Sequence, residues 1–191
     1  MKSIKTLTLL IACAGFMTIT TGFSQTKMVG GAPMYPSKDI VSNAVNSKDH
    51  TTLVAAVKAA GLVETLQGEG PFTVFAPTNS AFEKLPDGTV ATLLKPENKA
   101  KLQGVLTYHV VAGKYNAKDL KKWIKKGDGM AELTTVNGDT LTAMMDKGMI
   151  MIKDGAGNVS TVTIADVNQS NGVIHVVDTV VRSEERRVGK E

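Results

Sequence analysis

The chain has 191 residues, enough for one domain with a sizeable core but with little left for a second. Its apolar share of 42% is ordinary for a soluble globular protein, and its aromatic share of 5% predicts a core built mostly from aliphatic side chains. The net charge of +4 falls to +1 once Lys2 and Lys5, which carry +2, and residues 182–191, which carry +1, are set aside. So small a charge excludes an electrostatic argument for binding nucleic acid.

Residues 1–24 have the pattern of a signal peptide. Two lysines precede the largely apolar residues 6–20, which are too few for a typical membrane span, and small residues near Ser24 suit cleavage. The mature protein is therefore expected to be secreted or periplasmic. A rival interpretation is a lipid anchor on Cys13, within a Leu-Ile-Ala-Cys sequence that resembles a bacterial lipoprotein box, although the residues after it stay apolar. Cys13 is the single cysteine, so a cleaved protein has no disulfides or thiol chemistry.

Glycine and proline are frequent in residues 25–36, which we interpret as a linker or lead-in arm before a folded domain at residues 37–182. The helical spacing of apolar residues predicts helices between residues 40 and 60, which Gly61 is suited to end in a left-handed conformation. Residues 72–76 alternate as a strand does.

A further helix is predicted to include His109, which falls on its apolar side and is interpreted as a hydrogen-bonded core residue rather than a ligand. The next predicted helix, residues 117–125, is rich in lysine. We interpret its lysines as a solvated face, with an anion site as the alternative. From Met130 onward the apolar period changes to two, and Asn137–Gly138 is a strong hairpin signal.

Helices followed by a meander of strands predict an α+β fold and not a parallel α/β sheet. The last residues, 183–191, are charged and have no apolar period, so we expect a disordered tail.

Catalytic patterns are not found in the sequence, and an enzyme is not predicted. His175 and Asp178 are close in sequence, but residues three apart on a strand face opposite sides, so we expect no dyad. No Gly-x-Ser-x-Gly elbow, phosphate loop or dinucleotide fingerprint occurs. No cofactor is implied.

Four methionines occur close together in the sequence, and their thioethers are soft donors of the kind that Cu(I) prefers. They are Met144, Met145, Met149 and Met151. No histidine or cysteine is near them in sequence, and the shared strand face of Met149 and Met151 suits packing equally well. Packing is the interpretation that we favour, so no metal site is predicted.

Three stretches, in this order and spacing, resemble the signatures of the fasciclin (FAS1, beta-Ig-H3) domain family. They are residues 72–79 with Phe82 and Leu85, residues 106–111, and residues 171–178. The resemblance covers about Asp39 to Val181. It implies a FAS1 fold, a compact antiparallel β wedge or sandwich with N-terminal and flanking helices.

The same resemblance implies an exported, non-enzymatic module for cell adhesion or for binding the extracellular matrix or a cell surface. The implied partner is a cell-surface or matrix protein or a polysaccharide. Tyr108 and His109 match a family segment linked to receptor binding, although hydrogen bonding at a helix–strand junction explains them as well. An alternative function is a carrier of a small apolar ligand, a lipid or a pigment, which predicts a lined cavity.

The C-terminal end departs from the family. Members usually follow the final strand with a short apolar end, whereas Val181 is followed directly by the charged residues 182–187. Our hypothesis is that this tail is foreign to the natural gene.

Overall fold

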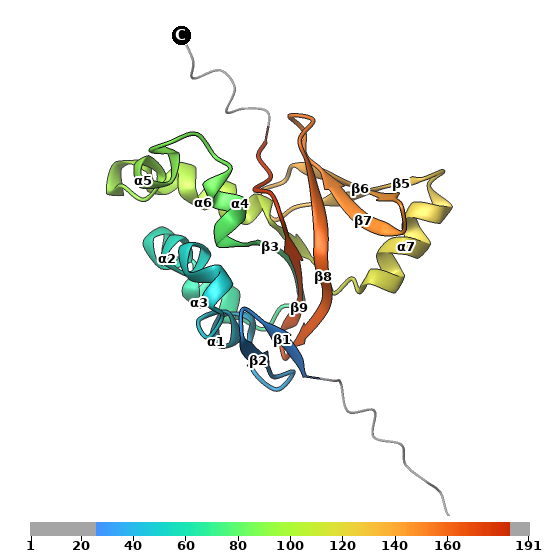
Figure 1. The fold of residues 1–191 in the computed structure, drawn as a ribbon, viewed down its shortest axis with the longest axis horizontal. Helices are drawn as coiled ribbons and strands as arrows, with labels where there is room; N and C mark the ends of the chain where they lie inside the picture. Colours follow the sequence, from blue (N-terminus) through green and yellow to red (C-terminus); the bar gives the residue numbers. More distant parts are fainter. Residues whose placement is uncertain (1–25, 184–191) are drawn as a thin grey trace, which may run out of the picture.

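A computed structural model describes residues 26–183 (Figure 1). The expected signal peptide, the alternative anchor at Cys13 and the tail from residue 184 lie outside the described residues. Within residues 26–183 no helix is long and apolar enough to cross a membrane.

Most helices belong to the first half of the domain and lie together on one side of the sheet (Figure 1). The helices are α1 (Ile40–Ala44), the 3₁₀ helix η1 (Lys48–His50), α2 (Thr51–Ala60), α3 (Val63–Gln67), α4 (Asn79–Glu83), α5 (Thr89–Leu93), the 3₁₀ helix η2 (Pro96–Asn98), α6 (Lys99–Tyr108) and α7 (Ala117–Lys126). Helix α2 ends at Gly61, whose φ of 70° confirms the predicted left-handed conformation. Helix α7 stands apart from the others, beside β5 and β6.

A seven-stranded sheet forms the centre of the domain, in the order β4-β3-β9-β8-β7-β6-β5. Its strands are β3 (Phe72–Pro77), β4 (Val110–Ala112), β5 (Met130–Thr134), β6 (Thr140–Asp146), β7 (Met149–Lys153), β8 (Val159–Gln169) and β9 (Gly172–Val177). The α+β class and the meander are confirmed. One neighbouring pair departs from the antiparallel expectation: β3 and β9 run parallel, with Phe72 opposite Gly172. A parallel pair requires a long crossover, which the helices and strands between β3 and β9 provide.

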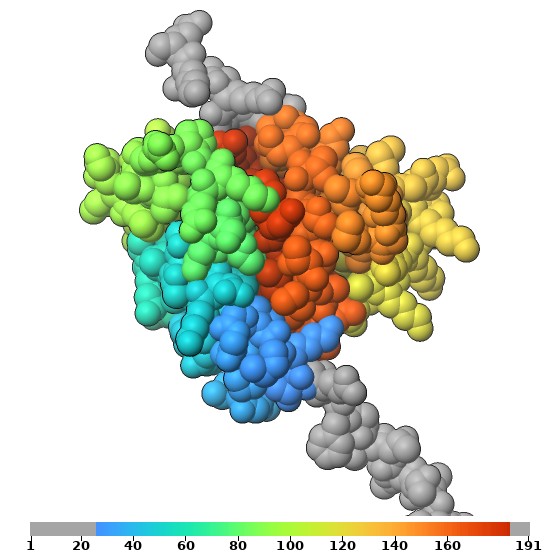
Figure 2. Space-filling model, in the orientation of Figure 1, coloured from blue at the N-terminus to red at the C-terminus, as the bar shows by residue number. Residues whose placement is uncertain are grey.

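The segment that we interpreted as a linker is instead a folded hairpin. Strands β1 (Lys27–Val29) and β2 (Ala32–Met34) pair antiparallel around Gly30 and Gly31, which both have positive φ. Val29 and Met34 are buried, at 4% and 3% exposure. Figure 2 shows the hairpin (blue) on the surface at the base of the domain. Its buried side chains belong to the apolar core, so the glycines form the tight turn of a packed hairpin and not a flexible joint.

Two clusters of buried apolar side chains lie on opposite faces of the sheet. The first lies beneath α1–α6 and the hairpin, and the second lies beneath α7. The central strand β3 supplies Val74 and Ala76 to the first cluster and Phe75 to the second. Strand β9 is buried along its whole length. Polar side chains on these strands are consequently in the interior, which determines the environment of His175.

Candidate functional site

Tyr108 and His109 lie where α6 meets β4, and neither side chain is presented at the surface, since their exposures are 1% and 3%. The Nδ1 atom of His109 lies 2.8 Å from the carbonyl oxygen of Val105, and Nε2 accepts a hydrogen bond of 3.2 Å from the Val181 N–H. A carbonyl can only accept, so Nδ1 carries the proton and the ring is neutral. His109 thus joins α6 to the segment after β9.

The phenol of Tyr108 has a similar joining role in the second cluster. Its hydroxyl donates to the Thr140 carbonyl at 3.0 Å and accepts from the Gly155 N–H at 3.0 Å. These bonds connect α6 to the start of β6 and to the turn between β7 and β8. The geometry therefore supports the junction interpretation of Tyr108 and His109, and a partner has no surface access to either ring.

All three histidines are buried, and burial disfavours the charged imidazolium in each. Burial lowers the pKa of His109 to about 4, opposed by the Val105 carbonyl and the Asp154 carboxylate. It also lowers the pKa of His50, opposed by the Ala76 backbone and Asp49. The Nδ1 atom of His50 lies 2.8 Å from Ser47 Oγ, and its Nε2 atom has no hydrogen-bond partner among the described residues.

His175 and Asp178 bond to different partners, in agreement with the strand parity. His175 Nε2 lies 2.8 Å from the Tyr115 carbonyl, and the ring stacks on Phe75 at 5.7 Å between centroids. Burial lowers its pKa. Asp178 accepts from the Thr161 N–H at 2.8 Å and pairs with Lys84 at 3.7 Å.

Metal-binding constellations of the common kind are not found: across residues 26–183 no three His, Cys, Asp or Glu side chains are grouped to hold an ion. His50, His109 and His175 make separate hydrogen bonds to Ser47, to Val105 with Val181, and to Tyr115.

The lysine-rich helix α7 is the most highly charged element. It buries Leu120 and Ile124 against the second cluster, and its five lysines are all exposed. They are Lys118, Lys121, Lys122, Lys125 and Lys126. Sequence reasoning missed an aromatic pair beside them: Trp123, 39% exposed, lies 4.7 Å from the Tyr115 ring between centroids. Tyr115 precedes the helix, so neither helical nor strand periodicity connects these two residues.

A profile of the fasciclin domain matches residues 48–183 of the chain. The chain belongs to the fasciclin domain family. Among similar proteins, protein sll1483 of Synechocystis is 50% identical over 142 residues, which are 74% of this chain and 72% of that protein. Cell surface glycolipoprotein MPB83 of Mycobacterium bovis is 33% identical over 74% of this chain and 59% of its own. Transforming growth factor-beta-induced protein ig-h3 of Sus scrofa is 37% identical over 68% of this chain and 17% of its own.

The FAS1 fold is shown by comparison with a solved structure, a FAS1 domain pair from the insect cell adhesion molecule fasciclin I. The TM-score is 0.68 at 19% identity, and the match covers 78% of this chain and 52% of the domain pair. This fasciclin chain therefore spans about half the length of that solved protein. At such low identity the likeness concerns the fold alone.

Within this fasciclin domain, an apolar cavity of about 50 Å³ lies in the first cluster, between the helices and the sheet. Aliphatic side chains line most of it, and His50 and His109 are among its few polar neighbours. Sites for drug-sized ligands usually hold roughly 300–1,000 Å³. This cavity beneath the helices is therefore too small for a lipid or a pigment.

Proposed function

We propose that this fasciclin domain is an exported, non-enzymatic binding module that attaches to a cell surface or an extracellular matrix. Family membership supports this role, because similar proteins include a cell surface glycolipoprotein and an insect cell adhesion molecule. The signal-peptide pattern of residues 1–24 supports the extracytoplasmic location.

Helix α7 presents a row of lysines that form no ion pairs within the described residues, and this row supports a more definite proposal about the binding partner. Lys118, Lys122 and Lys125 lie within about one third of the helix circumference, opposite the buried Leu120 and Ile124. Like charges three and four residues apart destabilise a helix. In the part of the chain that the structure describes, the single ion pair is Lys84 with Asp178, so these lysines find no carboxylate partner there. An anionic polymer would relieve their mutual repulsion.

Charge is also distributed unevenly over the domain. Helix α7 carries +4, from five lysines and one aspartate, whereas residues 6–181 as a whole carry +1, so the remainder carries −3. A concentrated positive face on an otherwise acidic domain orients it toward an anionic surface. The exposed Trp123 beside the lysines adds an apolar platform with a polar N–H. We infer that the partner is an acidic polysaccharide that lies along α7.

Retention on immobilised heparin, a model acidic polysaccharide, tests this proposal. Replacing Lys118, Lys122 and Lys125 together with Gln is expected to lower the NaCl concentration needed for elution, because screened surface attractions weaken as cations are lost. The matched control changes the same net charge elsewhere, by Gln substitution of three exposed lysines. These are Lys48, Lys95 and Lys101.

The control variant should elute near the wild type. Equal losses in the two variants would show attraction by net charge alone and would contradict a site on α7. Binding to vesicles containing anionic phospholipid, without retention on heparin, would assign the helix to a membrane surface instead and would overturn the polysaccharide proposal.

A further inference from the structure

Strand pairing gathers three methionines from three different strands into one row across β5, β6 and β7. Met130 on β5 lies opposite Met144 on β6, and Met144 lies opposite Met151 on β7. All three alternate with buried residues along their strands, so they share the face of the sheet that points away from the second cluster. Met130 is 56% exposed, and the other two are partly exposed.

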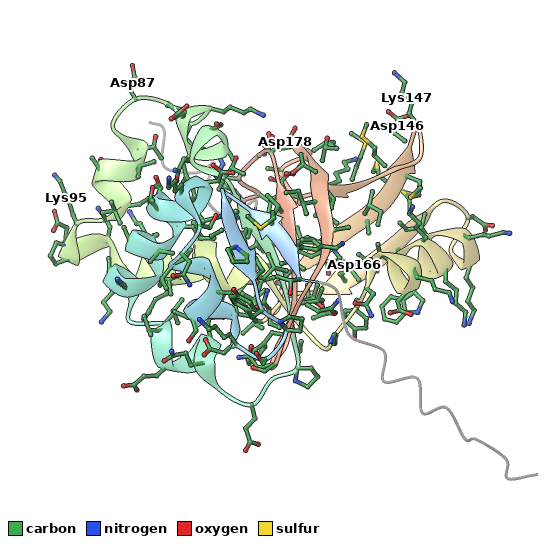
Figure 3. The ribbon with its side chains drawn as sticks, turned by 60° about the horizontal axis from the view of Figure 1, so that its bottom comes forward. Asp87, Lys95, Asp146, Lys147, Asp166 and Asp178 are labelled. Carbon is green, nitrogen blue, oxygen red and sulfur yellow. The ribbon has the colours of Figure 1, made fainter. Side chains whose placement is uncertain are left out.

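A fourth thioether lies beside the row. Met149 precedes Met151 by two residues on β7, faces the same side and is 48% exposed. Its partner across the pair is Asp146 at the end of β6. Met145 is not part of this group, because it pairs with the buried Ile150 and belongs to the other face. Figure 3 shows sulfur atoms (yellow) gathered beside the labelled Asp146.

The spacing of the row suits a single ion. Adjacent strands are about 4.8 Å apart, so the outer methionines are about 10 Å apart with Met144 midway between them. Sulfur atoms around one ion lie about 4 Å apart, given metal–sulfur bonds of about 2.3 Å. Methionine has three rotatable side-chain bonds, so Met130 and Met151 can lean toward Met144 without any movement of the backbone.

We propose that Met130, Met144 and Met151 form a thioether site for a soft monovalent cation, Cu(I) or Ag(I). Thioethers are soft donors that select Cu(I) over the hard cations Mg²⁺ and Ca²⁺. Met149 supplies a fourth sulfur at the side of the row. The carboxylate of Asp146 lies next to it and offsets the charge of the ion.

Packing alone does not account for the row. A methionine that fills a gap in a core is buried, whereas Met130 in the row and Met149 beside it expose about half of their surface, and Met144 and Met151 are partly exposed. The site is separate from the proposed polysaccharide surface, since α7 covers the opposite face of these strands through Leu120 and Ile124.

Ag(I) titration of the full chain locates the site directly, with ¹³C labels at the methionine methyl groups and with Cys13→Ser to remove the thiol that would bind Ag(I) first. Ag(I), as its nitrate in chloride-free buffer, needs no reductant. The methyl signals of Met130, Met144 and Met151 are expected to shift and to saturate at one equivalent. Met28, 60% exposed on the β1–β2 hairpin, is an internal control for non-specific binding and should not shift. Equal shifts at Met28 would overturn the proposal.

Affinity for Cu(I) is then measured by competition with a chromophoric chelator under ascorbate, with Cys13→Ser in every protein to remove the thiol. We expect a dissociation constant on the order of 1 µM or tighter. The triple variant Met130→Leu, Met144→Leu, Met151→Leu conserves volume and should keep the melting temperature while weakening binding to about 1 mM or beyond. The control Met28→Leu should bind as the parent does. A parent constant of millimolar or weaker, or a triple variant that binds as tightly as the parent, refutes the site.

Discussion

His109 joins two parts of the domain that are distant in the sequence. Replacement by Ala removes the acceptor for the Val181 N–H, 72 residues away, and opens space in the first cluster. An unsatisfied buried donor together with the lost packing is expected to cost about 3 kcal/mol or more. Urea unfolding at pH 7 measures this change in the free energy of unfolding.

Thr107→Ala is the matched control on the same helix. The Thr107 hydroxyl donates to the Gln103 carbonyl of its own helix, at 2.8 Å, and links no other element. Its removal should cost less than about 1 kcal/mol. A His109→Ala protein as stable as the wild type that fails to attach to its partner would instead support contact through this residue and contradict the junction interpretation.

The surroundings of a residue could be predicted from the sequence only where they depend on the spacing of apolar residues within one helix or strand. The position of His109 on an apolar helix face predicted its burial, which is confirmed. Its acceptance from Val181 was not predictable, because that bond depends on where β9 ends relative to α6. The burial of His50 was missed for the same reason, since residues of the hairpin and of β3 line the same cavity as His50.

The parallel pairing of β3 with β9 depends on a glycine. A Cβ atom on Gly172 would lie 2.1 Å from the carbonyl oxygen of Phe72, in the backbone of the neighbouring strand. No side chain can move to relieve that contact, so Gly172→Ala is expected to separate the two strands and to cost at least about 3 kcal/mol. The readout is the melting temperature, or soluble yield where the variant does not fold.

Gly138→Ala is the control for Gly172→Ala, because it tests backbone strain without the steric clash of an added Cβ atom. Gly138 has a φ of 90° in the turn between β5 and β6, and a Cβ atom there would meet nothing within 4 Å. Its substitution strains the backbone by about 1–2 kcal/mol without any clash. If Gly172→Ala and Gly138→Ala are equally stable, the close approach of β3 to Gly172 does not limit the stability of the domain.

Elements with a strong period were predictable, and those defined by their partners were not. The lysine-rich helix and the hairpin signal at residues 137–138 are confirmed, because helical spacing and turn chemistry are local properties. Residues 25–36 were interpreted as a linker or lead-in arm. The linker alternative is wrong, and the hairpin was not foreseen because each of its strands has three residues, too few for a period to be recognised. Met144 and Met151 were noticed in the sequence as part of a group of methionines, for which packing was favoured. Met130 was not connected with them, because strand register brings it opposite Met144.

The whole domain consists of two apolar clusters joined by the fully buried strand β9, and each cluster contains uncharged histidine. His50 and His109 line the cavity of the first cluster, and His175 stacks on Phe75 of the second. Family and fold could be predicted from three signatures. The partner could not, because it depends on surface residues such as Trp123 whose grouping the fold alone determines.

Acid should destabilise the whole domain in a defined pH range. The pKa of His109 is about 4 in the folded protein and about 6.5 in the unfolded chain, so the unfolded state binds more protons between these values. The stabilisation is complete above pH 6.5 and is lost as the pH falls toward 4. Between pH 7 and pH 4 the free energy of unfolding should decrease by about 3 kcal/mol from His109 alone. The lowered pKa values of His50 and His175 act in the same direction.

Urea unfolding at intervals from pH 7 to pH 4 tests this, with His109→Gln as the comparison. The Gln amide oxygen can accept from the Val181 N–H in place of Nε2, but the side chain does not titrate. The variant should therefore lose less stability on acidification than the wild type, by up to about 3 kcal/mol. Asp39 contributes at lower pH: burial alone would raise its pKa, but hydrogen bonds from Ser42 hold it below 3.8. Parallel stability curves for the two proteins between pH 6.5 and 4 would mean that His109 does not couple folding to protonation.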